Sequence, residues 1–115
     1  MATVRARPAR LNLAVYREDD FDLDLYFVNA AGTAIDLTGY SFTAEARDTA
    51  GTLIATFTDT LTDATGGQLT LTLPKATTET LPNSCKWDLQ AVTPGSKHQT
   101  WLTGTLTATG DITDI

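Results

Sequence analysis

The sequence predicts an all-β protein, a single Ig-like β-sandwich of about eight short, mainly antiparallel strands. Threonine supplies 23 of the 115 residues, and this β-branched residue is stiff at χ1 and suits a pleated, half-exposed surface. Apolar and polar residues alternate with a period of two through most of the chain. Turn-forming residues interrupt this alternation about every 8–12 residues, a spacing typical of sandwiches and small barrels.

The first third of the chain predicts an arm and two strands. Residues 1–10 are expected to form an extended basic arm, and residues 11–115 the sandwich domain. Apolar residues alternate with polar or small ones over residues 11–16, which predicts the first strand. The stretch REDD turns the chain, and residues 21–28 alternate again as a second strand. The stretch NAAGT, residues 29–33, predicts a hairpin turn, because its glycine can adopt a positive φ.

The middle of the chain predicts further strands. The stretch AIDLTGYSFTAEARD has an apolar run, a Thr-Gly turn and then strict alternation, which puts Phe42, Ala44 and Ala46 on one face. RDTAGT is the next turn, and Leu53 begins another strand. The polar stretch TDTLTDATGG, residues 58–67, is expected as a connection or as the second half of that strand. It leads into QLTLTL, the clearest period-two pattern in the sequence.

The last third predicts one helical turn and two strands. Pro74 and Pro82 frame residues 75–81, where we expect one short helical turn at most, with Leu81 as an apolar anchor. The stretch CKWDLQAV then predicts a strand, and TPGSK a Pro-Gly turn. QTWLTGTLTATGDIT predicts a long, threonine-rich final strand.

Composition and charge disfavour several function classes. The one cysteine, Cys85, cannot form an internal disulfide, and no segment has the apolar length of a signal peptide or a membrane span. Residues 1–17 carry four arginines and no acid, whereas the rest of the chain has four basic and 14 acidic residues. Because this body is acidic, we expect no nucleic-acid partner, although the basic arm can still touch phosphate. We expect no membrane partner either. We expect Arg5, Arg7 and Arg10 to dock on an acidic protein surface instead.

The residue patterns predict no enzyme, no metal site and no cofactor. His98, the only histidine, lies in a predicted turn without a serine or cysteine in a nucleophile-like context. Cys85 is expected to face inward from a strand, where a thiol behaves as a small apolar side chain. Asp20, Asp22 and Asp24 have the spacing of calcium ligands. In a strand, however, alternate carboxylates point in parallel instead of converging on an ion.

Two aromatic residues, Tyr26 and Trp101, fall out of phase with the apolar positions around them. An exposed tyrosine or tryptophan can anchor a protein interface. Either side chain can equally be covered by a loop, or a β-bulge can shift its phase. The sequence leaves both interpretations open.

Several stretches, taken in order, resemble a known module. They are VYREDDFDLDLYF, AIDLTGYSFTAEARD, GGQLTLTLPKATTETL, CKWDLQAV and WLTGTLTATGDIT. Together they are similar to a small β-sandwich domain of tail and baseplate proteins of tailed bacteriophages, including the N-terminal domain of baseplate upper proteins from phages of Gram-positive hosts. The similarity spans residues 11–114 and implies a structural role in a virion.

The sequence departs from this family at two places. Where family members often carry glycine after the arginine, this chain has Glu18, so we expect a different first turn. Larger members continue into a stalk and a fibre or receptor-binding region, whereas this chain stops at Ile115. The resemblance therefore favours an adaptor over a fibre.

The function that the resemblance implies is a structural component of a phage virion, a tail or baseplate adaptor that docks tail fibres or neighbouring ring proteins. Its expected partners are other phage structural proteins and copies of itself, joined by face contacts or by strand pairing at a sheet edge, after synthesis in the host cytoplasm. Two alternatives stay open. One is a capsid decoration (cement) protein, and the other is a carbohydrate-binding module that stacks sugars on Tyr26 and Trp101.

Overall fold

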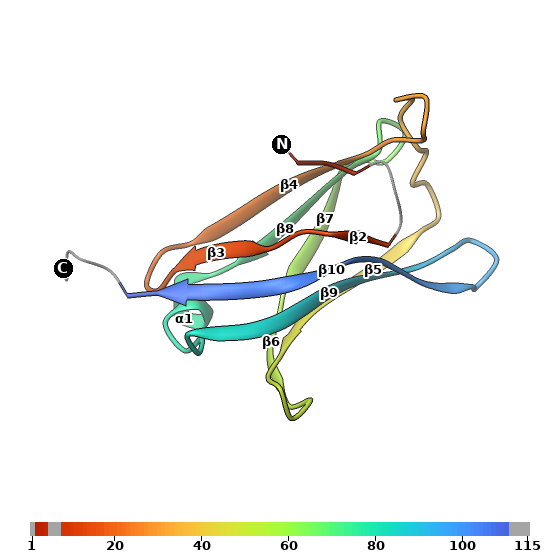
Figure 1. Ribbon diagram of the computed structural model, residues 1–115. Coiled ribbons are helices and arrows are strands. Elements are labelled where there is room, and N and C mark those ends of the chain that lie inside the picture. The colour runs from red at the N-terminus through yellow and green to blue at the C-terminus, as the bar shows by residue number, and fades with distance from the viewer. Residues whose placement is uncertain (1, 5–7, 111–115) are drawn as a thin grey trace.

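The computed structural model describes residues 2–4 and 8–110, and within them the chain forms strands with one short helix between them (Figure 1). The elements in chain order are β1 (Ala2–Val4), β2 (Ala9–Arg10), β3 (Leu13–Tyr16), β4 (Phe21–Phe27), β5 (Ser41–Arg47), β6 (Leu53–Thr56), β7 (Thr58–Asp63), β8 (Gln68–Leu73), α1 (Lys75–Thr78), β9 (Ser84–Val92) and β10 (His98–Thr109).

The strands form two sheets that pack face to face. The four-stranded sheet has the order β1-β4-β8-β7, and the six-stranded sheet has the order β2-β10-β9-β5-β6, with β3 also paired to β10. Most pairs are antiparallel, whereas β1 pairs parallel with β4, and β2 and β3 pair parallel with β10. The predicted all-β sandwich is confirmed.

The chain changes sheet at places that the period-two pattern does not mark. After β6 it passes through Phe57, which is buried between the sheets, and enters the other sheet as β7. Residues 58–63 are thus a strand in their own right, paired with β8. The hairpin predicted at residues 29–33 is reduced to a single bridge between Val28 and Ala34, because the chain then leaves the four-stranded sheet to reach β5.

The N-terminal residues lie along both sheets. Ala2–Val4 pairs with the end of β4, and Val4 is part of the buried core. Ala9 and Arg10 pair with Leu102 and Thr103 of β10. The described part of the predicted arm is therefore extended backbone that lies on the sandwich.

Leu11 and Asn12 lie between β2 and β3, the two strands that pair with β10, and other parts of the chain satisfy their polar groups. The Leu11 N–H donates to the carbonyl oxygen of Thr103 at 2.9 Å. The Trp87 indole Nε1 donates to the Leu11 carbonyl oxygen at 2.8 Å, and the Thr105 N–H donates to the Asn12 Oδ1 at 3.0 Å. A Cβ at Gly104 would overlap the Leu11 carbonyl group, so only glycine lets the two strands approach this closely.

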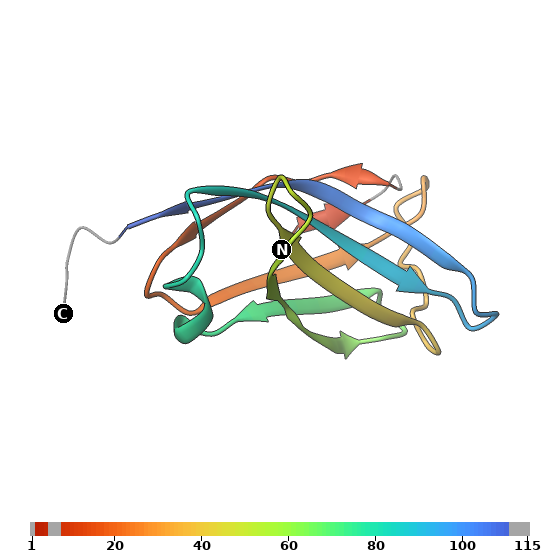
Figure 2. The same cartoon turned by 90° about the horizontal axis from the view of Figure 1, so that it is seen from below.

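The predicted helical turn near residues 75–81 is present as α1, which lies at the same end of the sandwich as the end of β10 (Figure 2). The hydroxyl of the fully buried Thr78 donates to the Asp19 carbonyl oxygen at 2.8 Å. Leu81 is buried in the core, as expected, and the Arg17 Nε donates to its carbonyl oxygen at 2.9 Å. These bonds fasten the connection between β8 and β9 to the turn before β4.

Three five-residue turns share one geometry. In the turns that begin at Asn29, Asp48 and Thr93, the side-chain oxygen of the first residue accepts a hydrogen bond from the fifth amide. The amide of the fourth residue donates to the first carbonyl oxygen. This fourth residue has a positive φ, and it is glycine in the first two turns but Ser96, at φ 67°, in the third. A side chain is strained in this conformation. Glu18, where we expected a different first turn, is also left-handed, at φ 72°.

Replacing Ser96 by glycine should therefore raise the free energy of unfolding by about 0.5–1 kcal/mol. The matched control is Gly51→Ser, which should lower it by about 1 kcal/mol. A Cβ at Gly51 meets no atom within 4 Å, so only the backbone conformation is tested there. Urea denaturation followed by circular dichroism measures both changes. A loss of stability in Ser96→Gly would show that the third turn does not share this strain.

Candidate interaction surfaces

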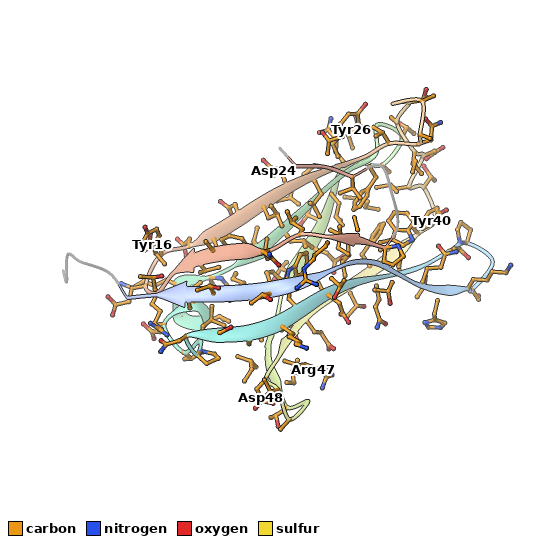
Figure 3. All side chains as sticks on the ribbon, viewed as in Figure 1. Tyr16, Asp24, Tyr26, Tyr40, Arg47 and Asp48 are labelled. Atoms are coloured by element: carbon orange, nitrogen blue, oxygen red, sulfur yellow. The ribbon has the colours of Figure 1, made fainter. Side chains whose placement is uncertain are left out.

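The outer face of the four-stranded sheet presents Tyr26 among polar side chains. Figure 3 shows Asp24 and Tyr26 on the outer side of β4, directed away from the sandwich. Tyr26 is half-buried, and its register partners are Thr3 on β1 and Gln68 on β8. The Thr70 hydroxyl donates to the Asp24 Oδ1 at 2.9 Å. Tyr26 thus lies on an outer face, where it can contact another molecule.

A shallow hollow of about 390 Å³ lies at the other end of this face. It is lined by Asp20, Asp22, Thr58, Thr72, Leu73 and Pro74. The Lys75 N–H donates to the Asp20 Oδ1 at 2.8 Å, so this carboxylate holds the start of α1. Within residues 2–4 and 8–110, no group of three or more His, Cys, Asp or Glu side chains is placed to hold a metal ion.

The outer face of the six-stranded sheet carries a row of charged residues across its strands. Arg10 on β2 is opposite Thr103 on β10, which is opposite Asp88 on β9, which is opposite Glu45 on β5. Arg10 is exposed, and Asp88 and Glu45 are half-buried. The Arg47 guanidinium forms a salt bridge of 3.0 Å with Glu45. Burial and the neighbouring charge of Glu45 raise the pKa of Asp88, and the charge of Arg47 partly offsets them.

Trp101 does not contribute to any surface, so its prediction as an interface residue is wrong. Its side chain is 1% exposed, because the pairing of β10 with β9 shifts register between Thr100 and Leu102. This bulge turns Trp101 inward together with Leu102. The indole ring packs against Phe27 and Phe42, with ring centroids 5.1 and 5.4 Å apart.

The two residues considered for catalysis, Cys85 and His98, differ in exposure. Cys85 is 2% exposed in the core, and burial together with the charge of Asp48 raises the pKa of its thiol. His98 is the exposed first residue of β10 instead of part of a turn. Its register partner is Val92. The inward orientation predicted for Cys85 is confirmed.

The remaining residues of the predicted interface lie outside the described part of the chain. These residues are Arg5 and Arg7, and their contact with an acidic surface stays a prediction. No pattern in the sequence indicates that the carboxylates of Asp88 and Glu45 lie opposite each other. They are 43 positions apart in the sequence, and only the register of β5 against β9 brings them together.

These features define a β-sandwich domain that presents polar side chains on two outer faces. The family model of the LtfC-like β-sandwich domain matches residues 7–109, and the chain belongs to this family. No curated protein matches the chain. No helix among the described residues is long and apolar enough to cross a membrane.

A solved structure of a phage protein domain shares the fold. The N-terminal domain of phage TP901-1 ORF48 superposes with a TM-score of 0.57, covering 94% of this chain and 98% of that domain at 10% identity. The Lin-41 filamin domain gives a TM-score of 0.47 at 14% identity, covering 84% of this chain and 82% of that one. The resemblance to a phage β-sandwich domain, stated from the sequence, is confirmed.

Asp88→Asn should raise the free energy of unfolding at pH 7 by roughly 0.2–1 kcal/mol, because it removes a like-charge cross-strand pair. Since the folded state raises the pKa of Asp88, its carboxylate destabilises the fold above the folded-state pKa. That penalty disappears as the pH falls below the unfolded-state pKa. The gain should therefore vanish in acid. Urea denaturation over a pH series measures it.

Asp36→Asn is the control of opposite sign. The Thr38 hydroxyl and N–H both donate to the Asp36 Oδ1, at 2.6 and 2.9 Å, and lower its pKa. This carboxylate stabilises the fold above its unfolded-state pKa, and the contribution is lost as the pH falls through the folded-state pKa. Asp36→Asn should thus destabilise the chain at pH 7. A pH-independent gain from Asp88→Asn would contradict the electrostatic explanation.

Proposed function

We propose that this chain is a structural component of a bacteriophage virion, a tail or baseplate adaptor that docks tail fibres or neighbouring ring proteins. The observation that carries the proposal is the shared fold with the N-terminal domain of phage TP901-1 ORF48 over nearly the full length of both. Membership in a β-sandwich family over residues 7–109 supports the same role.

The shape and surface of the domain suit a building block. The sandwich measures 43 × 29 × 21 Å, and its polar outer faces can each meet a neighbouring protein. Strand β7 forms one edge of the four-stranded sheet, and all six of its residues are exposed. Such an edge can pair with an extended segment of a partner. The net charge of −6 favours protein partners over nucleic acid or anionic membranes.

The proposed role requires no catalysis. A cysteine acts as a nucleophile through its thiolate, which a lowered pKa and solvent access favour. Cys85 has the opposite properties, since it is buried and its pKa is raised. We therefore assign Cys85 to the core.

We propose that Arg5, Arg7, Arg10 and Tyr26 contact neighbouring virion proteins. Arg10 lies on the outer face of the six-stranded sheet, and Tyr26 lies on the outer face of the four-stranded sheet. Because these faces point in opposite directions, one copy can contact two neighbours at once. The carbohydrate-binding alternative loses support, because Trp101 is buried and cannot stack on a sugar.

Quantitative mass spectrometry of purified virions from a phage that encodes this chain tests the proposal. We expect the chain in a copy number similar to that of tail-tip proteins and far below that of the major capsid protein. Arg5→Glu combined with Arg7→Glu should lower its incorporation about tenfold, by reversing charges that pair with carboxylates. Lys97→Glu, an exposed change in the turn before β10, is the control and should leave incorporation unchanged.

Two outcomes would contradict the adaptor role. A copy number close to that of the major capsid protein would indicate a cement protein instead. Absence of the chain from virions would reject a structural role in the particle.

A further inference from the structure

We infer that two copies of this chain associate through the outer face of the six-stranded sheet, with Arg10 of each copy paired to Asp88 of the other. The inference deepens the proposed function, on which it rests, by naming a second copy as one partner of this face.

The register fixes the relative positions of the two charged side chains. Arg10 and Asp88 are the register partners of the same residue, Thr103, on either side of β10. Residues directly opposite each other in a sheet project from the same face. Arg10 and Asp88 are thus two strand spacings apart, about 10 Å. Both residues are described in the structure, and no salt bridge joins them within one copy.

The nearby charge of Arg47 compensates Asp88 only in part, and Arg10 lies at the far end of the row. Within residues 2–4 and 8–110, neither Arg10 nor Asp88 forms an ion pair, and the salt bridge on this face joins Arg47 to Glu45. Asp88 also lies directly opposite Glu45, a like charge. The row therefore has a positive end at β2 and a negative end at β9 and β5.

A two-fold axis along β10 makes this row complementary to itself. When two such faces meet about this axis, each row lies on the reversed row of the other copy. Thr103 then faces Thr103 of the second copy, and Arg10 faces Asp88 in both directions. A two-fold interface forms each contact twice, so two ion pairs result. Glu45, one strand further on, adds negative charge near the second copy's Arg10.

Two rows further toward the end of β10, the surface is lined by small side chains. The row next to Thr103 holds Thr105, with Lys86 on β9 and Arg47 on β5 beside it. The row after that holds Ala14 on β3, Thr107 on β10 and Ser84 on β9, and all three are exposed. Figure 1 shows β10 between these two strands. Small side chains permit the sheet separation of about 10 Å found in face-to-face packing.

The opposite face of the sandwich does not have this complementarity. On the outer side of the four-stranded sheet, β4 carries Asp22 and Asp24, and no lysine or arginine lies in β4, β7 or β8. Two copies that met through this face would bring like charges together, which opposes association. Charge complementarity therefore selects the face with Arg10 and Asp88.

Sedimentation velocity on the purified chain, over a series of concentrations, tests the inference. We expect a reversible monomer–dimer equilibrium that weakens as salt is added. Arg10→Asp and Asp88→Arg should each raise the dimer Kd about tenfold. Combining the two substitutions should restore the Kd to about the value of the unchanged chain, because the exchanged charges pair again.

Matched controls separate this effect from a general change of charge or a loss of folding. Lys97→Asp and Glu79→Arg change exposed residues outside this face and should leave the Kd unchanged. Circular dichroism reports whether each variant is folded. A chain that stays monomeric at every concentration, or a double variant that does not recover association, would overturn the inference. Neither result would affect the mass-spectrometric test of the virion role.

Discussion

The sandwich depends on the contact that the backbone of Leu11 makes with Trp87 and Gly104. The N-terminal segment of the six-stranded sheet pairs with β10 in two pieces, β2 and β3. In the break between them, the Leu11 carbonyl oxygen has no strand partner to donate to it. The Trp87 indole N–H donates a hydrogen bond to that carbonyl oxygen instead. Gly104 has no Cβ, which leaves space for the carbonyl group. An unpaired buried carbonyl would cost roughly 1–3 kcal/mol. This contact fixes β2 and β3, and with them the place of Arg10.

Much of the fold could be predicted because a half-buried strand alternates apolar and polar residues, and this alternation is visible in the sequence. The alternation in β8 and β5 identified their inward residues, and the proline-framed segment identified α1. The alternation does not show where the chain crosses to the other sheet, or where a β-bulge shifts which residues face inward. Phe57 continues the alternation of β6 while the chain crosses between sheets, and the bulge before Leu102 turns Trp101 inward without any residue that marks it.

The candidate surfaces were predictable only where one strand determines them. Tyr26 lies on an outer face because its phase opposes that of Leu25 and Phe27, which the sequence shows directly. The row from Arg10 to Asp88 depends on two strand registers, and single-strand patterns carry no information on these. The resemblance to a phage module could be recognised because it rests on short stretches of sequence. A surface for association could not be predicted in this way, because it depends on how the strands are arranged in the folded sheet.

The central claim is the proposal that this domain is a structural component of the tail end of a phage particle. Immunogold electron microscopy of purified virions, with an antibody raised against this chain, tests the claim most directly. The account predicts gold particles confined to the tail end. Label spread over the head, with the same antibody recognising the purified chain in controls, would contradict it.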